Sequence, residues 1–323
     1  MFMHRRPSLK AREAMAEAAM KLGEGVESAE EHPQVKEAEK VLSEALSRRV
    51  RLMASGNSAI LAAVKIAGRE ILIPDQGGWK SFKTIPEMLG KKVVGLETKR
   101  GIIEPEKLED TIHKFHPSAF LFTSSAGYMA EQPVEEIVRI CREEGVLTIE
   151  DISGAFGDSF SGRADIVVCS TGAPKILNLT SGGFIGGKEL DGAMEIIKAS
   201  RISPVVASGL LEEIKFAHHV LDSLYRGAVV IKEDIPEALF QESRGIAVGI
   251  LCNDPKKVAY RARAYGMITD IGRSLITTCP RYERLNDRGI VVELKKVDAV
   301  SLSDEDFKAM ADMVGRALSP EIV

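Results

Sequence analysis

The chain has few cysteines and few aromatic residues. Its 323 residues include four cysteines and one tryptophan, and aromatic side chains make up 5% of the sequence. Cys169 and Cys252 lie inside apolar, strand-like runs, and Cys141 and Cys279 are far from them along the chain. No two of the four form a Cys-x-x-Cys pair. We therefore expect buried structural thiols, and the spacing predicts no cysteine-based metal site.

Long apolar runs and an excess of one charge are also missing. No segment approaches the roughly 18 uncharged apolar residues of a membrane-spanning helix. The 43 basic and 47 acidic residues give a net charge of −4. We therefore expect neither a membrane span nor binding to nucleic acid. Residues 1–25 are basic and then amphipathic and lack the apolar centre of a signal peptide, so a cytoplasmic location is expected.

Histidines at ligand spacing are missing as well. Among the six histidines, His218 and His219 are adjacent and would point in different directions from a helix. No carboxylate or cysteine lies near them at the spacing that a metal site requires. No metal site is predicted.

Between residues 35 and 204, helix-like and strand-like segments alternate. Apolar residues at helical spacing predict helices at 34–47, 56–68, 104–115 and 133–145. Continuous apolar runs predict strands at 49–55, 70–75, 91–97, 118–125, 146–152, 164–171 and 182–187. Apolar strands separated by helices favour an α/β fold with a mostly parallel sheet and helices on both faces.

The pattern changes after residue 205. A long helical stretch at 209–228 is followed by strand-like runs at 245–252, 274–279 and 289–296, a helix at 256–266 and a last helix. That helix opens at Ser303 with Ser-x-x-Asp, which approximates a capping box. We therefore expect three units: an N-terminal helical arm (1–34), a large α/β domain (35–204) and a small C-terminal α+β domain (205–323).

The loops that follow the strands hold the candidate site, because ligands bind beyond the carboxyl ends of the strands in open α/β sheets. Gly56, Asn57 and Ser58 follow the first strand at a helix start, where amides and a hydroxyl can hold a phosphate. Trp79, the single tryptophan, lies in the glycine-rich loop after 70–75. Tyr128 lies in the loop after 118–125.

The last two loops supply a carboxylate and an amine. Asp151 lies at the end of the run 146–152. Ser170, Thr171 and Lys175 follow the next strand, in a small-residue loop between two apolar runs. Burial there would lower the pKa of Lys175 and make it a usable amine.

Together these parts are what pyridoxal phosphate (PLP) requires. Lysine forms the imine with its aldehyde, a carboxylate keeps its pyridine nitrogen protonated, an aromatic side chain stacks on the ring, and a helix start takes the phosphate. Each part alone also has an ordinary interpretation, such as a helix cap, core packing or a solvated lysine. Their order along one sheet favours the cofactor site.

The region from about residue 40 to 200 resembles the fold type I PLP enzymes of the aspartate aminotransferase superfamily. Within it, SGNSAILAAVKIAGREILIPD (55–75) is similar to a "SGTxAL…GDEVIVP" segment of the DegT-type aminotransferases. The segment 101–112 resembles the family's segment before the next strand, and 127–157 resembles the stretch that contains its cofactor-binding aspartate. The resemblance implies that Lys175 is the Schiff-base lysine and Asp151 the partner of the pyridine nitrogen.

The same resemblance implies further cofactor and substrate contacts. The expected cofactor-binding residues are Gly56, Asn57, Ser58, Trp79, Ser153, Ser170 and Thr171. Arg281 and Tyr128 are the candidates for substrate binding, since an arginine can hold a carboxylate by two hydrogen bonds. The expected activity is transfer of an amino group between a small-molecule donor and acceptor. A homodimer with shared active sites is also implied.

Three departures from the DegT pattern leave the reaction open. Gly154 stands where the sugar aminotransferases carry Gln or His, Asn57 replaces a threonine, and Lys175 follows Asp151 by only 24 residues. The short spacing is closer to selenocysteine-synthase-like and desulfurase-like relatives. A PLP-dependent lyase or a β-replacement enzyme is therefore an alternative to an aminotransferase, and a non-catalytic regulatory relative is a second one.

Overall fold

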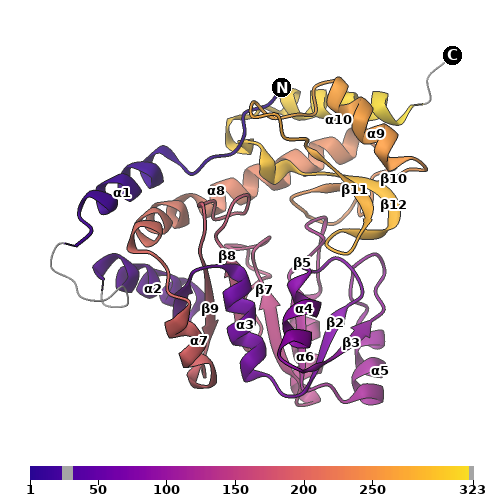
Figure 1. Ribbon diagram of the computed structural model, residues 1–323. Coiled ribbons are helices and arrows are strands. Elements are labelled where there is room, and N and C mark those ends of the chain that lie inside the picture. The colour runs from indigo at the N-terminus through magenta and orange to yellow at the C-terminus, as the bar shows by residue number, and fades with distance from the viewer. Residues whose placement is uncertain (24–31, 320–323) are drawn as a thin grey trace.

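The computed structural model describes residues 1–23 and 32–319. A large α/β part is built on a seven-stranded sheet, and a smaller C-terminal part, β10 to α10, is built on a three-stranded one (Figure 1). Helix α8 runs from the first part to the second. The helices are α1 (Leu9–Met20), α2 (Pro33–Leu46), α3 (Gly56–Ile66), α4 (Ser81–Met88), α5 (Pro105–Phe115), α6 (Val134–Glu143), α7 (Met194–Ala199), α8 (Pro204–Asp234), α9 (Pro255–Ala264) and α10 (Asp304–Leu318).

The large sheet has the strand order β1-β9-β8-β7-β4-β2-β3. Strand β9 is antiparallel to both of its neighbours, and the other six strands share one direction. The carboxyl ends of these six strands therefore meet at one edge. The strands are β1 (Val50–Met53), β2 (Glu70–Pro74), β3 (Lys92–Leu96), β4 (Ala119–Thr123), β7 (Leu147–Asp151), β8 (Ile166–Ser170) and β9 (Gly183–Gly187).

Helices cover both faces of this sheet because successive strand residues point to opposite sides. In β2, Ile71 and Ile73 belong to the apolar cluster under α3, α4 and α7, and Leu72 belongs to the cluster under α5 and α6. In β4, Leu121 faces the first cluster, and Phe120 faces the second. The predicted fold class, a mostly parallel sheet with helices on both faces, is confirmed.

Helix α4 was not expected from the sequence. Its Phe82 and Ile85 are buried at helical spacing, but Pro86 lies inside the helix, where proline removes a backbone donor. The tetrapeptide QGGW before it favours a loop. The helix has only eight residues, so its two buried apolar positions did not outweigh the proline and the glycines as evidence. Packing against α3 stabilises it.

The C-terminal part packs on α8. Its antiparallel sheet has the order β10 (Val248–Leu251), β12 (Leu285–Val292), β11 (Ile276–Arg281). The capping box predicted at Ser303 is confirmed, because its hydroxyl accepts from the Asp306 amide and the Asp306 carboxylate accepts from the Ser303 amide. The short elements are β5 (Ser125–Ala126), β6 (Ala130–Glu131) and the 3-10 turns at Asp191–Ala193, Leu294–Lys296 and Ala299–Ser301.

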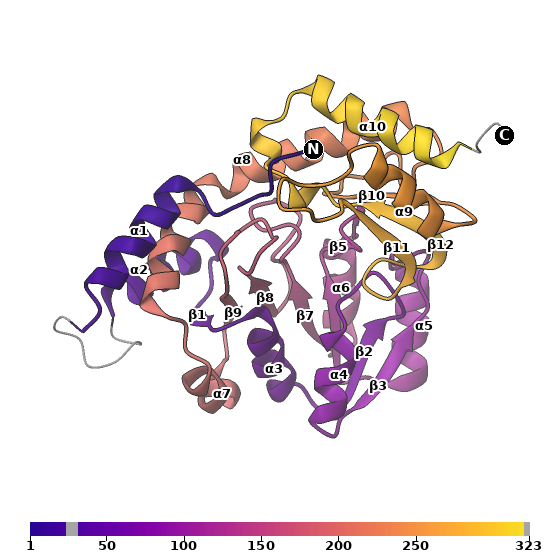
Figure 2. The ribbon, with the colours of Figure 1, turned by 45° about the horizontal axis from the view of Figure 1, so that its top comes forward.

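The N-terminal segment joins the two parts. Phe2 and His4 form single bridges with Thr269 and Val297 of the C-terminal part. Helix α1 then lies along α8, beside α2 (Figure 2). The predicted arm, residues 1–34, extends over 24–31, which lie outside the described residues. Within the described ranges, no helix has the length and apolarity needed to cross a membrane.

All four cysteines are free. Cys141, Cys169 and Cys279 are buried, and burial raises the pKa of each thiol. The predicted burial is confirmed for Cys169. It is wrong for Cys252, which lies just beyond the end of β10 and is only partly buried. These thiols are therefore structural.

A buried carboxylate anchors the loop that follows β7. Both oxygens of the fully buried Glu150 accept hydrogen bonds, from the Ser124 hydroxyl at 2.7 Å and from the amides of Gly162, Arg163 and Ala164 at 2.9–3.1 Å. Glu150 directly precedes Asp151. The loop geometry next to the candidate site therefore depends on this one side chain.

Replacing Glu150 by alanine should destabilise the chain by about 3 kcal/mol, because the buried Ala164 amide and the part-buried Gly162 and Arg163 amides lose their acceptor, at about 1–3 kcal/mol for a buried group. Thermal denaturation measures the effect. Glu143→Ala is the control, since Glu143 is exposed on α6 and makes only a surface ion pair with Arg139. Equal melting temperatures for the two variants would contradict the anchoring role.

Candidate active site

A cavity of about 230 Å³ opens at the carboxyl edge of the large sheet. The ends of β1, β7 and β8 and the loops after them form its walls. Seven of the residues predicted from the sequence line it: Gly56, Asn57, Trp79, Asp151, Ser153, Ser170 and Lys175. The structure therefore brings together the amine, the carboxylate, the helix start and the indole ring.

The start of α3 forms one end of this cavity. Ser55 caps the helix by accepting from the Ser58 amide at 3.1 Å, and its hydroxyl also contacts the Ser58 hydroxyl at 2.9 Å. The first amides of the helix have no partner within it. Gly56 has no side chain here because a Cβ would lie 2.6 Å from Cβ of Ser170. The helix start and the end of β8 can therefore approach closely.

Asn57 holds the loop that carries the tryptophan. Its Oδ1 accepts from Nε1 of Trp79 at 3.0 Å and from the hydroxyl of Ser81 at 2.9 Å. The indole is 37% exposed, and its ring centroid lies 5.3 Å from Nζ of Lys175. The amide side chain therefore orients a flat aromatic surface over the cavity.

Asp151 is buried and belongs to a short chain of hydrogen bonds. Its Oδ1 accepts from the amide of Ser153 at 2.9 Å, and the Ser153 hydroxyl accepts from the amide of Ser170 at 2.8 Å. These bonds tie the end of β7 to the end of β8. They leave the second carboxylate oxygen of Asp151 for the cavity.

Lys175 is partly buried, and its amine hydrogen-bonds to the hydroxyl of Tyr128. Burial lowers the pKa of Lys175, but the Tyr128 hydroxyl and the Asp151 carboxylate outweigh it, so the net pKa is raised. The sequence-based expectation that burial would depress this pKa is therefore wrong. The missing factor was the neighbourhood of Tyr128, which is 47 residues away along the chain.

Ser58 and Thr171 serve the framework around the cavity. Ser58 is engaged in the helix cap described above. The Thr171 hydroxyl is buried and donates to the carbonyl of Ser181 at 2.9 Å, which closes the base of the Lys175 loop. Neither residue is among the lining residues of the cavity.

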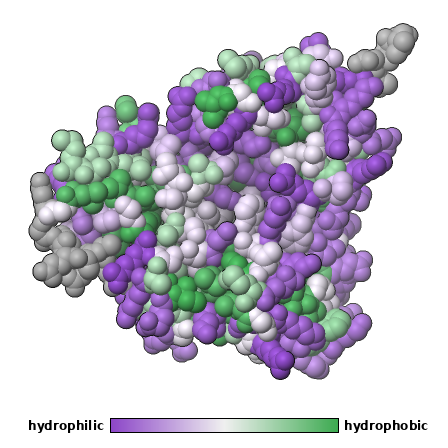
Figure 3. All heavy atoms as spheres, in the orientation of Figure 1, coloured by the Kyte–Doolittle hydropathy of each residue, from purple (hydrophilic) through white to green (hydrophobic). Residues whose placement is uncertain are grey.

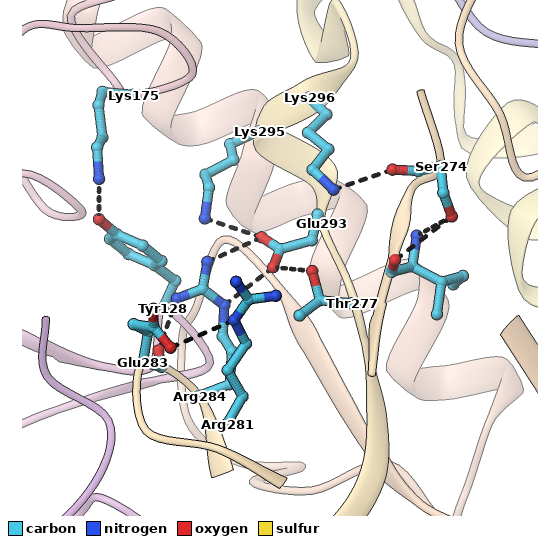
Figure 4. Close-up of polar contacts among 11 residues, drawn as sticks. Tyr128, Lys175, Ser274, Thr277, Arg281, Glu283, Arg284, Glu293, Lys295 and Lys296 are labelled. Atoms are coloured by element: carbon cyan, nitrogen blue, oxygen red, sulfur yellow. Dashed lines mark hydrogen bonds and ion pairs between the residues drawn. The ribbon is translucent and has the colours of Figure 1, made fainter. Parts of the chain in front are cut away.

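A second cavity of about 300 Å³ adjoins the first, with Trp79, Ala173 and Lys175 shared between them. Tyr128 and Arg281 line it, as do five charged residues of the C-terminal part that sequence reasoning missed: Glu283, Arg284, Glu293, Lys295 and Lys296. Figure 4 shows Arg284, Glu293 and Lys295 grouped beside Tyr128, whereas Lys296 turns toward Ser274 and donates to its carbonyl at 2.9 Å. In the sequence, only the charged residues at the end of the run GIVVELKK (289–296) could have indicated this group of side chains.

Glu293 is the centre of this cluster. It is fully buried, and it bonds to Arg284 Nε at 2.9 Å, to Lys295 Nζ at 2.8 Å and to the Thr277 hydroxyl at 2.8 Å. The two cations keep the pKa of Glu293 well below its usual range despite its burial. Arg281 is half exposed and pairs with Glu283 at 3.3 Å.

Among the residues that the structure describes, one surface group of side chains could hold a metal ion. Ligand-type atoms of Glu109, His113 and Glu144 lie within 4.8 Å of one another, and all three residues are exposed. His113 and Glu144 form an ion pair at 3.1 Å, which raises the pKa of the histidine. This contact is explained as a surface ion pair between α5 and the end of α6.

Replacing Asn57 by alanine should weaken binding of PLP by about 30-fold, since two hydrogen bonds of about 1 kcal/mol each that fix Trp79 and Ser81 are lost. Because Trp79 is the only tryptophan, its fluorescence reports binding directly. Asn253→Ala is the control, since Asn253 lines a different cavity in the C-terminal part. An unchanged affinity would show that the orientation of Trp79 is unimportant.

Two family profiles match the sequence. The DegT/DnrJ/EryC1/StrS aminotransferase family matches residues 13–198, and the MJ1341 family C-terminal domain matches residues 218–315. A search of curated protein sequences gives no match.

Solved structures share the fold at low sequence identity. A DegT DnrJ EryC1 StrS aminotransferase from Brucella abortus has a TM-score of 0.75 at 15% identity, with 96% of each chain covered. Helicobacter pylori PseC, an aminotransferase of pseudoaminic acid biosynthesis, has a TM-score of 0.74 at 15% identity, with 98% of each chain covered. A serine palmitoyltransferase from S. paucimobilis with a bound PLP–myriocin aldimine has a TM-score of 0.75 at 16% identity, covering 96% of this chain and 83% of that one.

The family profile spans more than half of the chain and includes the loops after β1, β2, β7 and β8 that form the first cavity. The resemblance inferred from the sequence is confirmed. The chain belongs to the DegT/DnrJ/EryC1/StrS aminotransferase family.

Proposed function

We propose that the chain is a PLP-dependent aminotransferase in which Lys175 holds the cofactor as a Schiff base. One observation carries this proposal: Lys175, Asp151 and the start of α3 line a single cavity. The donor set suits the group chemically. An amine can condense with the aldehyde, a carboxylate can face the pyridine nitrogen, and helix amides can take the phosphate.

The residues around the cavity have separate roles in this proposal. The amides of Gly56 and Asn57 and the hydroxyl of Ser170 hold the phosphate. Trp79 covers the ring, and Ser153 orients the Asp151 carboxylate through the 2.9 Å bond from its amide. Ser58 and Thr171 support these contacts from behind. Bound PLP supplies an electron-accepting ring, and Asp151 keeps a positive charge on its nitrogen.

Lys175 then acts as the acid–base group. Its Nζ takes a proton from the substrate carbon and returns it on the cofactor side, as a positioned amine can. The raised pKa of Lys175 in the free chain favours its protonated form, so the amine must give up this proton before it can condense with an aldehyde or accept a proton. Tyr128 and the buried walls of the second cavity keep this amine directed toward the reacting atoms.

The second cavity is proposed to hold the substrate. Five of its lining residues are basic and two are acidic, so it suits an anionic ligand such as the carboxylate of an amino donor. The basic residues are Lys175, Arg281, Arg284, Lys295 and Lys296. Arg281 remains our candidate for that carboxylate, because it is half exposed and only loosely paired. Tyr128, the other candidate for substrate binding, lines this cavity together with Lys175.

A single-turnover experiment tests the reaction. The PLP-loaded chain mixed with glutamate should release one equivalent of 2-oxoglutarate and retain the amino group on the cofactor. Failure with every amino donor would exclude transamination. Pyruvate or ammonia released from serine would favour the lyase or β-replacement alternative. A chain that never binds PLP would be a non-catalytic relative.

We further propose a cytoplasmic homodimer with shared active sites and the three domains expected from the sequence. Apolar side chains gather over α1 on the face shown in Figure 3. Leu9, Met20 and Leu22 are 61%, 85% and 54% exposed there. Such a patch on a helix is typical of a protein interface. Light scattering at micromolar concentration should give twice the mass of one chain, and a monomer would refute the dimer.

A further inference from the structure

Tyr128 occupies an unusual backbone conformation. It has φ +66°, directly after Gly127 at φ +55°, in the turn between β5 and β6. A positive φ is uncommon for a bulky side chain and costs on the order of 1 kcal/mol. The surrounding contacts must therefore hold the residue in place.

The large α/β part provides a place for the Tyr128 ring at Gly154. A Cβ on Gly154 would lie 2.3 Å from Cδ1 and 2.4 Å from Cε1 of that ring. The glycine is therefore required by the tyrosine, and any larger residue would displace it. The ring of Tyr128 fills the space next to Gly154 that a side chain would otherwise take.

The C-terminal part contacts the same ring with two cations. Nζ of Lys295 lies 3.8 Å and Cζ of Arg284 lies 4.7 Å from the ring centroid. Both are held by Glu293, and the side chains of Arg284 and Lys295 are only 10% and 5% exposed. Cations over an aromatic face are attracted to it, more strongly when they are desolvated.

We propose that Tyr128 positions the amine of Lys175 and that the C-terminal part controls this contact through the two cations on the Tyr128 ring. The inference rests on the proposed function only in taking Lys175 as the cofactor lysine. In this proposal Arg284 and Lys295 hold the Tyr128 ring, and the ring in turn holds the Lys175 amine. Arg284 and Lys295 are therefore positioning residues.

The charges around Lys175 predict opposite effects for two variants. Tyr128 and Asp151 raise the pKa of Lys175, and Arg284 lowers it by repulsion. Lys175 and Lys295 repel each other, and this repulsion is one cause of the lowered pKa of Lys295. The nearby Cys169 is a buried thiol with a raised pKa. Removing the Tyr128 hydroxyl should therefore lower the pKa of Lys175, so that its amine loses a proton at lower pH. Removing Lys295 should keep the amine protonated to higher pH.

The test uses the full chain without cofactor. An amine-specific acylating reagent is applied in short pulses across a pH series, and labelling of Lys175 is read from its peptide by mass spectrometry. We expect Tyr128→Phe to lower the pH midpoint of labelling by roughly one unit and Lys295→Met to raise it. Gly154→Ala should act like Tyr128→Phe, because its Cβ pushes the ring away.

The controls are Tyr260→Phe and Lys188→Met, which change exposed residues of the same types and should leave the midpoint unchanged. Circular dichroism confirms that each variant is folded. Midpoints that stay fixed, or that move in the same direction for Tyr128→Phe and Lys295→Met, would overturn the proposal. Since the assay contains no PLP, a chain that shows the opposite shifts but never attaches PLP would refute the proposed function alone.

Discussion

Replacing Lys175 by alanine should abolish covalent attachment of PLP and lower amino-group transfer by about 10²–10⁴-fold, the usual contribution of a positioned acid–base group. The amine lies in the cavity with Asp151 and the start of α3. Binding of PLP itself should persist, because the phosphate and ring contacts do not depend on Nζ. The fluorescence of Trp79 should therefore still respond to PLP in this variant.

Borohydride reduction followed by peptide mass spectrometry locates the attachment. The wild-type chain should carry the added mass on Lys175, and Lys175→Ala should carry none. Lys188→Ala is the matched control, since Lys188 is exposed and lies outside both cavities. The method also separates Lys175 from Lys295 and Lys296, which line the second cavity. Reduction that marked either of these two lysines would transfer the cofactor role to it.

The first cavity was predictable because it depends on strand ends. Parallel strands bring their carboxyl ends to one edge, so a residue such as Asp151 or Lys175 can be placed from its position after an apolar run. The order of the loops along the sequence then indicated that these residues share one edge of the sheet. Helix starts such as that of α3 also carry a local signal, in the serine that caps them.

The second cavity was not predictable, since it depends on contacts between distant segments. Arg284 lies just before β12, and Glu293 and Lys295 lie just after it. Nothing in the local sequence shows that Arg284 and Lys295 face Tyr128. The direction of the pKa shift of Lys175 was predicted wrongly for the same reason, since it depends on Tyr128. Gly154 could be noticed as a departure from the family pattern, but its cause is the Tyr128 ring.

Replacing Asp151 by asparagine should weaken PLP binding by about 10²–10⁴-fold, which corresponds to the roughly 3–5 kcal/mol lost when one partner of a buried charge pair is removed. Asparagine keeps the shape of the side chain and can still accept the bond from the Ser153 amide. The change therefore removes the charge beside the pyridine nitrogen and leaves the loop intact. Quenching of Trp79 fluorescence measures the affinity.

Asp151→Asn should have a second effect without cofactor. The carboxylate raises the pKa of Lys175, so its loss should move the pH midpoint of Lys175 labelling downward, in the direction of Tyr128→Phe. Asp191→Asn is the control, because the Asp191 side chain is 89% exposed and pairs only with Arg49 at the surface, at 3.7 Å. A variant that binds PLP like the wild type but shows the shifted midpoint would place the carboxylate near Lys175 and give the ring nitrogen another partner. A variant unchanged in both measurements would remove Asp151 from the site.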